Sequence, residues 1–511
     1  MQFIRFILAL VPIIWLMVAL SVLKLPGFLA CIITVVITAF ESICIWNFSS
    51  TNMLTAALEG ALNALWPICL VIVAALYTYV LTLETGAMEK IKKMLAGVSE
   101  DQRVLALLIA WGFGHFMEGM AGFGTAVAIP AGILIALGME PLPVVVGCLV
   151  VNSMPTAFGS VGVPIATISS ITGLSPVEIA ANTAKIEVLI FFMLPFFLVF
   201  IVGNGFKAFK GMTEMIVVAA ISYIVPMLIF ANYVGPELPN IVGAICSMIS
   251  IVVFAKKRRR EVPEEYLAKT AIAPDSSSEP LSRQEALIAW APFLLIFVLL
   301  VLTSLVPFIK QPLSSIRSSF HIYAGDPESK LTFVWINTPG VIILISAVIG
   351  GLIQGATPLK LLHIFGRTVR TNVRTFVTIM CVLGTAKIMS YSGMTSDMAA
   401  FLVAVTGSYY PFIPPLIGTL GGFVTGSGTS TCVLFGPMQV QTAKAIGADP
   451  SWLIAANTCG AGIGKMISPQ GIAIGAASAG LSGSESRLMA SVMKYCILFV
   501  VIAGVLSYFL Q

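Results

Sequence analysis

An internal duplication with a spacing of about 307 residues constrains the fold of this chain more than any other feature of its sequence. Phe116-Met117-Glu118-Gly119 has its counterpart in Phe423-Val424-Thr425-Gly426, and positions 116 and 423 differ by 307. Further matched pairs, with offsets from 305 to 309, are Pro130 and Pro437, Pro141 and Pro450, Asn152 and Asn457, Gly159 and Gly464, Pro164 and Pro469, and Gly173 and Gly480. Solenoid repeats usually span about 20 to 50 residues. A unit of this length is instead typical of half a secondary transporter.

The composition indicates that the duplicated unit lies in a membrane. Hydrophobic residues make up 58% of the 511 residues and charged residues only 10%, whereas a soluble domain has about 25% charged residues. A helix of about 20 apolar residues crosses a hydrocarbon core of about 30 Å. Apolar runs of suitable length occur at 3–23, 28–46, 61–83, 187–203, 214–234, 237–255, 286–307, 338–354, 372–390 and 488–510. The sequence therefore predicts an all-α, polytopic protein of the cytoplasmic (inner) membrane.

The distribution of Lys and Arg predicts how the chain is oriented. Loops 84–103, 204–213, 256–285 and 355–374 are basic, whereas 47–60, 231–238 and 392–410 contain neither Lys nor Arg. Basic loops stay in the cytoplasm, so the N-terminus is expected outside and the linker 256–285 inside. The two copies then enter their motifs from opposite sides, as inverted-topology repeats do. We expect a first repeat at 1–203, a two-span connector with a polar linker at 204–285, and a second repeat at 286–511.

Several partners and chemistries are not expected. The nine cysteines are scattered and there are three histidines, so neither a metal site nor a redox centre is indicated, and no cofactor is expected. The net charge of +5 comes mostly from basic loops, so no nucleic acid is expected either. The basic run Lys256–Arg260 could contact anionic membrane lipids, although such a run is more often only a topology signal. The sequence leaves a homodimer open.

Each copy has two stretches that are too rich in glycine and proline for ordinary spanning helices. The first lies around Gly112–Gly132 in one copy and Gly418–Pro437 in the other, and the second at Asn152–Pro164 and Asn457–Pro469. Backbone that leaves the helix at membrane depth must be buried in protein or line a cavity. Broken or re-entrant helical hairpins at matched positions mark a substrate site, and their free N–H groups suit a carboxylate. Close packing of small residues is the alternative, but it does not account for two matched pairs.

Individual side chains within these stretches are candidates for the site. Glu118 is a candidate proton carrier because burial disfavours a charged carboxyl, with a structural capping role equally open. Lys465 has no charged counterpart in the first copy and is the best candidate to pair with a substrate carboxylate, or else with Glu118. His115 titrates near neutrality when unperturbed, but a packing role is the better interpretation. The remaining candidates for substrate binding are Asn152, Asn457, Ser427, Thr429, Ser430, Gln470, Gly122 and Gly124.

At these residues the chain resembles the L-lactate permease family of bacterial transporters. The resemblance runs from about residue 55 to the C-terminus and is weakest in 260–335. The segments that carry it are Glu118-Gly119-Met120-Ala121-Gly122-Phe123-Gly124, Asn152-Ser153, Gly235-Pro236-Glu237-Leu238-Pro239, Thr425-Gly426-Ser427, and Gly464-Lys465-Met466-Ile467-Ser468-Pro469-Gln470. The resemblance implies a proton-coupled symporter for L-lactate and related 2-hydroxy monocarboxylates such as glycolate.

Three positions depart from the family pattern. Gly428 stands where an aspartate is expected, His115 where a small residue is expected, and Lys387 where an apolar one is expected. Losing an acid and gaining a base makes the interior more positive. A dicarboxylate substrate or another coupling ion, such as sodium, therefore remains an alternative. We expect Lys387 to lie near a helix end and to extend outward to the membrane surface.

Other function classes fit the sequence less well. No Gly-x-x-x-x-Gly-Lys-Ser/Thr motif is present, so ATP is not expected as the energy source. An anion channel would need a pore lined by repeated charges or carbonyls. An intramembrane hydrolase would need a nucleophile with its base, and Gly426-Ser427-Gly428 has no histidine near it in sequence.

Overall fold

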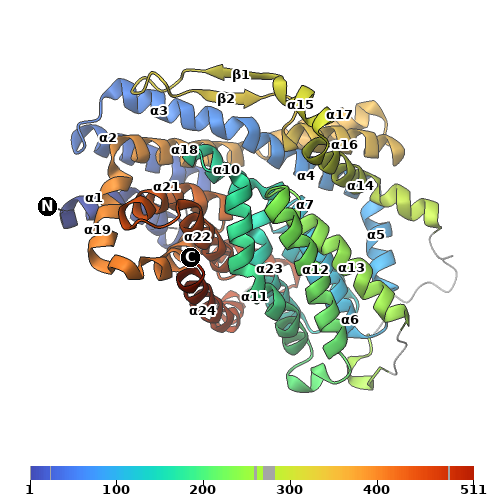
Figure 1. The fold of residues 1–511 in the computed structure, drawn as a ribbon. Coiled ribbons are helices and arrows are strands. Elements are labelled where there is room, and N and C mark those ends of the chain that lie inside the picture. Colours follow the sequence, from blue (N-terminus) through green and yellow to red (C-terminus); the bar gives the residue numbers. More distant parts are fainter. Residues whose placement is uncertain (1, 24, 123, 258–261, 269–281, 482–483) are drawn as a thin grey trace.

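The structure is a computed structural model that describes residues 2–23, 25–122, 124–257, 262–268, 282–481 and 484–511, most of them helical (Figure 1). Within these residues, 11 helical segments are long and apolar enough to cross a membrane. The prediction of an all-α, polytopic membrane protein is confirmed.

The first copy consists of eleven α-helices joined by short connections. Its helices are α1 (Gln2–Met17), α2 (Gly27–Cys44), α3 (Ser50–Asn63), α4 (Leu70–Glu84), α5 (Ala87–Ala96), α6 (Gln102–Ala106), α7 (Gly114–Met120), α8 (Thr125–Ala136), α9 (Pro141–Val151), α10 (Gly159–Thr172) and α11 (Pro176–Val202). Wider π-helical turns at Val18–Val22, Ala64–Cys69 and Leu107–Phe113 extend α1 or join neighbouring helices, and a 3-10 turn at Met154–Phe158 precedes α10.

The connector and the second copy complete the chain. The connector contains α12 (Thr213–Tyr233) and α13 (Pro239–Lys257), with 3-10 turns at Phe206–Phe209 and Glu264–Tyr266. The elements that follow are α14 (Arg283–Leu305), α15 (Pro307–Ser315), β1 (Arg317–Phe320), β2 (Leu331–Val334), α16 (Pro339–Ile353), α17 (Pro358–Thr371), α18 (Val373–Ser392), α19 (Met394–Thr406), a 3-10 turn at Gly407–Phe412, α20 (Ile413–Thr425), α21 (Gly428–Ile446), α22 (Pro450–Lys465), α23 (Pro469–Ser478) and α24 (Glu485–Phe509).

The loop 308–335 contains a small antiparallel hairpin. Strands β1 and β2 pair Arg317 with Val334 and Phe320 with Leu331. The hairpin lies along α3 in Figure 1, and the Ala324 amide next to it donates to the Thr55 hydroxyl of that helix at 3.1 Å.

Matched sequence signals begin and break the helices at matched positions. Both α9 and α22 start with a proline that follows an acidic residue, at Pro141 and Pro450. Proline is favoured in the first turn of a helix. The first break lies between α7 and α8 in one copy and between α20 and α21 in the other. The second lies between α9 and α10 and between α22 and α23. Both predicted pairs of broken helices are therefore present.

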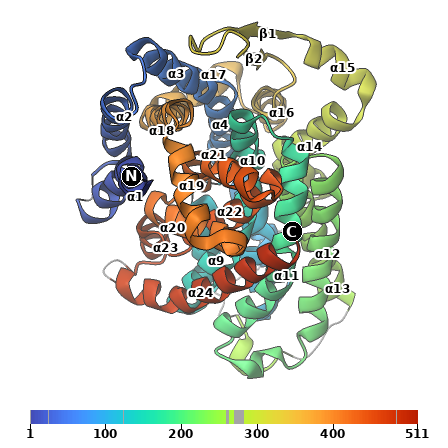
Figure 2. The same cartoon turned by 60° about the vertical axis from the view of Figure 1, so that its left-hand side comes forward.

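The two copies exchange their outer helices. Helices α1 and α2 pack against α19 and α18 of the second copy, and α14 and α16 pack against α5 and α4 of the first; Figure 2 shows α2 beside α18. The boundaries expected at 203 and 286 therefore separate the two copies along the sequence, but in the structure helices of one copy pack against helices of the other. The inversion of the two copies across the membrane stays a prediction.

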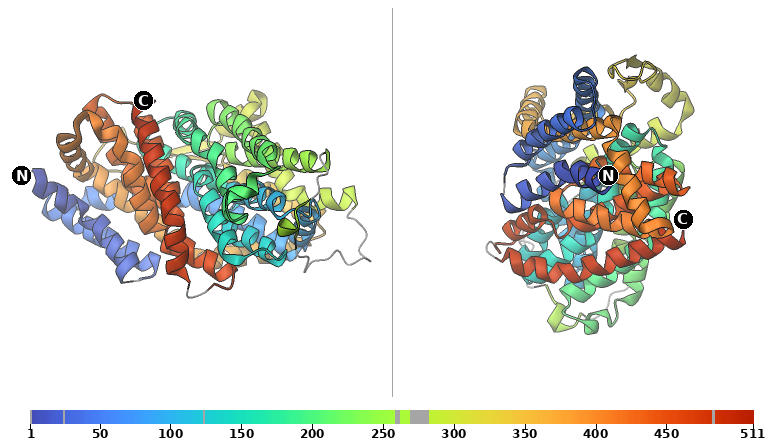
Figure 3. Two further views of the ribbon diagram at one scale, coloured as in Figure 1. Left: turned by 90° about the horizontal axis from the view of Figure 1, so that it is seen from below. Right: turned by 90° about the vertical axis from the view of Figure 1, so that its left-hand side faces the viewer.

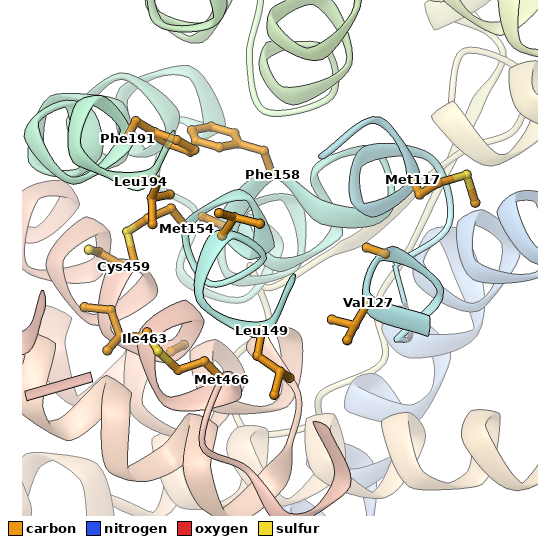
Figure 4. Packing of buried hydrophobic residues seen from close by; sticks show 14 of the residues in the cluster. Met117, Val127, Leu149, Met154, Phe158, Phe191, Leu194, Cys459, Ile463 and Met466 are labelled. Carbon is orange, nitrogen blue, oxygen red and sulfur yellow. The ribbon is translucent and has the colours of Figure 1, made fainter. Parts of the chain in front are cut away.

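Buried apolar side chains pack against the second break of each copy. Leu149 of α9, Met154 of the 3-10 turn, Leu194 of α11 and Ile463 of α22 pack together there and are buried (Figure 4). Seen from below, α24 crosses one face of the molecule (Figure 3), where it packs against α22. This core holds the backbone of both second breaks in place.

The predicted inversion can be tested by chemical labelling. In a background without the nine native cysteines, a cysteine at Ser99, before α6, is expected to react only with a reagent in the cytoplasm. Cysteines at Ser49 and Ser396, both exposed, are expected to react only from outside. Labelling of positions 99 and 396 from the same side would contradict inverted repeats. Ser276, a further cytoplasmic position in the expected linker, and Arg258–Arg260 lie outside the described residues.

Candidate functional site

All four helix breaks contribute to one cavity of about 560 Å³. Its wall is completed by α18 and by the N-terminal helices α1 and α2. The predicted site residues that line it are Glu118, Gly124, Asn152, Ser427, Thr429, Ser430, Lys465 and Gln470. The tertiary structure thus brings together residues from both copies.

An ion pair between Glu118 and Lys465 lies at the centre of this site. Lys465 Nζ is 2.6 Å from Glu118 Oε1, and the two side chains are 15% and 3% exposed. Lys465 is the last residue of α22, where the negative end of the helix dipole favours a cation. Glu118 fits beside the second break because Gly159 has no side chain: a Cβ there would be 2.8 Å from Oε1.

Two polar side chains of the first copy hold this pair. Asn152 Nδ2 donates to Glu118 Oε2 at 3.2 Å, and Lys465 Nζ donates to the Thr156 hydroxyl at 3.3 Å. That hydroxyl in turn donates to the Asn152 carbonyl at 3.1 Å. Among the residues that the structure describes, the hydrogen-bonding partners of the pair therefore come from one 3-10 turn and its flanks.

Helix N-termini of the second copy face the same cavity. At the start of α21 the Ser430 amide donates to the Ser427 hydroxyl at 3.2 Å, and at the start of α23 the Gly471 amide donates to the Ser468 hydroxyl at 3.0 Å. Gln470 packs against Gly426, which has a φ of +63°. The positive ends of two helix dipoles thus add to the charge of Lys465, an arrangement that suits an anion.

Charge in the cavity wall favours an anion overall. The charged lining residues that the structure describes are Glu118, Lys465 and Arg374. Arg374, near the start of α18, is exposed and lies 5.5 Å from the centre of the Phe28 ring. In sequence reasoning it counted only as a member of a basic loop, and no local signal marked it as a cavity residue.

Thr156 was also missed by sequence reasoning. It lies inside the predicted broken stretch and bonds Lys465, so a survey of every polar residue in that stretch would have found it. The same residue explains the glycine at position 428, where the resemblance to the family led us to expect an aspartate. A Cβ at Gly428 would lie 2.8 Å from Thr156 Cγ2, so the glycine lets the start of α21 approach the first copy.

Three of the sequence candidates lie outside the cavity wall. His115 is fully buried, its Nε2 is 2.9 Å from the Val151 carbonyl oxygen, and its ring lies 4.2 Å from that of Trp111. Asn457 is 1% exposed and accepts from Gln439 at 3.4 Å. Gly122 has a φ of +60° and leaves room for the Ser160 hydroxyl, which donates to the Ala121 carbonyl. Gly122 therefore joins the first break of its copy to the second.

The expectation that Lys387 extends outward is wrong. Its Nζ is 2.7 Å from Glu59 Oε1, with the two side chains 9% and 5% exposed. The Tyr391 hydroxyl donates to the same carboxylate at 2.9 Å, and the Tyr391 ring stacks on Tyr323 at 3.9 Å. Sequence reasoning missed Glu59, although an acidic residue inside an apolar helix is a signal of a buried charge that can be read from the sequence. An intramembrane lysine takes a buried counter-charge when one is within reach.

We expect Lys387→Ala to lower the free energy of unfolding by about 3 kcal/mol, because it leaves the Glu59 carboxylate buried without its cation. Thermal unfolding of the purified protein in detergent measures this. The double variant Glu59→Gln/Lys387→Met is expected to regain most of the loss, and Lys444→Ala, at an exposed position, serves as the control. An unchanged unfolding temperature for Lys387→Ala would show that the pair adds nothing to stability.

The family model described as L-lactate permease matches residues 5–511, so the similarity begins well before residue 55. The chain is 41% identical over 450 residues to the L-lactate permease of Streptococcus iniae, covering 88% of this chain and 93% of that protein. It is 34% identical over 531 residues to the glycolate permease GlcA of Escherichia coli (strain K12), covering 98% and 94%. Among solved structures, the YdaH transporter of Alcanivorax borkumensis matches with a TM-score of 0.45 and 14% identity, covering 92% of this chain and 87% of that one.

Proposed function

The chain belongs to the L-lactate permease family, and we propose that it is a proton symporter for L-lactate or a related small 2-hydroxy monocarboxylate such as glycolate. It is a multi-pass membrane protein and a transporter, not an enzyme, as its relatives are permeases. The observation that carries the finer proposal is the Lys465–Glu118 ion pair in the cavity between the four helix breaks.

Lys465 is the group proposed to bind the substrate carboxylate. It is a lysine at the wall of a cavity, and the N-termini of α21 and α23 lie in the same wall. A carboxylate at this position would meet one full positive charge and the positive ends of two helix dipoles, which together offset the cost of leaving water. The hydroxyl groups of Thr429 and Ser430 add further donors.

Glu118 is the group proposed to carry the coupling proton, because it competes with the substrate for the same ammonium group. While Glu118 is ionised it occupies Lys465 at 2.6 Å. Protonation removes that charge and frees Lys465 for the substrate. When the substrate leaves, Lys465 pairs with Glu118 again and the proton is released.

A charge count explains why proton and substrate would move together. Arg374 is exposed to solvent and is left out of this count of buried charges. The pair alone is neutral, and so is the complex of protonated Glu118, Lys465 and a monocarboxylate. Substrate bound beside ionised Glu118 would leave one net negative charge in the interior, which is costly. Only the two neutral forms are then suited to cross the membrane, and this gives one proton for each monocarboxylate.

Uptake into proteoliposomes tests the proposal. Radiolabelled lactate and glycolate should accumulate when the outside is more acidic than the inside, and uptake should saturate with concentration. An imposed sodium gradient at equal pH should drive no accumulation. Accumulation driven by sodium alone would show that sodium, and not the proton, is the coupling ion. Uptake that does not saturate would indicate an anion channel.

A dicarboxylate is the second candidate substrate, and Arg374 is the observation that favours it. This residue gives the cavity wall a second cation that a second carboxylate would meet. Malate and succinate should therefore be tested as competitors of lactate uptake. If malate or succinate competes more strongly than unlabelled lactate, and this competition is lost in Arg374→Gln, the dicarboxylate is supported. If the competition is weak and equal in the wild type and in Arg374→Gln, the monocarboxylate is favoured.

The cellular placement belongs to the same proposal. A location in the cytoplasmic membrane with the N-terminus outside follows from the loop charges, and lipids of that membrane would surround the exposed apolar faces. A homodimer and the division into repeats at 1–203 and 286–511 remain predictions.

A further inference from the structure

We propose that Arg374 captures substrate anions at the cytoplasmic mouth of the cavity and sets the affinity for substrate on that face of the membrane only. The inference rests on the proposed function, because it concerns how the carboxylate reaches Lys465. It adds a second cation to the pathway, one that the substrate meets outside the buried part of the cavity.

The cavity opens to solvent at one end. Its exposed lining residues, among those that the structure describes, come from the turn between α1 and α2, the start of α18 and the start of α23. They are Pro26, Gly27, Arg374, Pro469 and Gln470. Helices α2 and α18 lie side by side (Figure 2), so Arg374 lies at the rim of this opening.

The opposite end of the cavity is closed by packed helices. Val163 and Pro164 of α10 and Leu434 of α21 line the cavity there and are buried, and α10 packs against α21. Asn63 of α3 donates to the Ser170 hydroxyl of α10 at 3.2 Å. A substrate anion therefore enters and leaves this form of the protein at the end that contains Arg374.

The predicted topology places the open end in the cytoplasm. Arg374 is the last residue of the basic segment 355–374, and basic loops stay in the cytoplasm. The turn between α1 and α2 lies on the same side when the N-terminus is outside, because α1 crosses the membrane once. Both walls of the opening thus belong to the cytoplasmic side of the predicted topology.

Arg374 has the chemistry of a capture site. The residue is exposed, its guanidinium lies 5.5 Å from the centre of the Phe28 ring, and it forms no ion pair with an acid among the residues that the structure describes. An aromatic face attracts a guanidinium, and the charge stays free for a carboxylate, which an arginine binds through two parallel hydrogen bonds. A cation at the mouth of a cleft also attracts anions and speeds their entry.

Helix α18 connects the mouth to the interior. Its lining residues run from Arg374 through Thr378 to Val382, a span of about 12 Å at the helical rise of about 1.5 Å per residue. Val382 is 3% exposed, whereas Arg374 is exposed. The wall therefore passes from solvent to interior along this helix, and capture at Arg374 precedes burial of the substrate.

The test measures lactate exchange separately at each face of the membrane. Inside-out vesicles present the cytoplasmic face to the medium and right-side-out vesicles present the outer face, while the opposite face holds saturating unlabelled lactate. In Arg374→Gln the lactate concentration for half-maximal exchange should rise about tenfold at the cytoplasmic face at low ionic strength and stay unchanged at the outer face. Added salt should shrink this difference, because ions screen an exposed charge.

Three further variants make the result specific. Arg370→Gln removes an exposed arginine of the same basic segment that does not line the cavity, so both faces should behave as in the wild type. Arg374→Lys keeps the charge and should keep most of the affinity. Arg374→Cys, in the background without native cysteines, should lose affinity at the cytoplasmic face. An aminoethyl thiol reagent, which adds a positive charge, should restore it, and a sulfonatoethyl reagent, which adds a negative one, should not.

The outcomes separate this inference from the proposed function. If wild-type vesicles exchange neither lactate nor glycolate at either face, the proposed function fails. If they exchange lactate and Arg374→Gln changes the affinity at neither face, the capture role is overturned. An equal effect in Arg370→Gln would overturn it as well, by showing that only the overall charge of the surface matters. An effect at the outer face alone would overturn the cytoplasmic placement of the mouth.

Discussion

Lys465→Ala is expected to weaken lactate binding by about a hundredfold or more. Lys465 is the cation in the cavity wall that contacts Glu118, and removing one partner of a buried charge pair costs about 2–5 kcal/mol or more. The measurement is the concentration of lactate that gives half-maximal uptake in proteoliposomes, with equal amounts of folded protein confirmed by gel filtration.

Two further variants make this result specific. Lys444→Ala removes an exposed lysine of the second copy and should leave uptake unchanged. Lys465→Arg should also impair binding, because the planar guanidinium does not replace the compact ammonium in a closed site. The single variant leaves Glu118 buried without its cation, so Glu118→Gln/Lys465→Ala separates lost binding from lost folding. Near-normal affinity in a folded double variant would contradict the assignment of Lys465.

Glu118→Gln is expected to abolish accumulation of lactate against its gradient while part of the exchange at equal pH remains. Glutamine keeps the size of the side chain and an acceptor for Asn152, but it cannot exchange a proton. It also leaves Lys465 without the competing carboxylate, so lactate should bind with similar or higher affinity. A pH jump applied to proteoliposomes measures accumulation, and counterflow of labelled against unlabelled lactate measures exchange.

The pH dependence of binding gives an independent control for the same variant. In the wild type, binding should strengthen as the pH falls, because protonation of Glu118 frees Lys465. In Glu118→Gln this dependence should disappear. Accumulation driven by a pH gradient in the variant, as strong as in the wild type, would remove Glu118 from the coupling path. His115 is buried away from the cavity, so sodium would then be the next coupling ion to test.

Much of the site was visible in the sequence because its signals are local. The glycines and prolines of the breaks act on their own backbone, so both pairs of breaks could be placed without knowing what surrounds them. The apolar runs likewise predicted the spanning helices, since length and hydrophobicity alone decide whether a helix can cross the membrane. The candidates Glu118 and Lys465 stood out as charges inside such segments.

Other parts could not be read from the sequence because they depend on contacts between distant segments. Lys387 was expected at the surface, but α3 brings Glu59 to it. The distance between the two residues along the chain gives no sign of this contact. His115 belongs to no visible pattern, and only its packing among aromatic rings shows that it lies outside the cavity. The exchange of outer helices between the copies was equally hidden, because an apolar face does not specify which apolar face it meets.

The sequence by itself determined the membrane class, the duplication and the positions of the helix breaks, because each follows from composition or from the backbone preferences of single residues. The tertiary structure decided which side chains meet. It placed Lys465 against Glu118, which is 347 residues away in the chain, and it placed Asn152 at the cavity wall while enclosing its counterpart Asn457 against Gln439. In a low-dielectric interior each charge takes the counter-charge that packing brings within reach. That choice is a property of the assembled helices and not of any one of them.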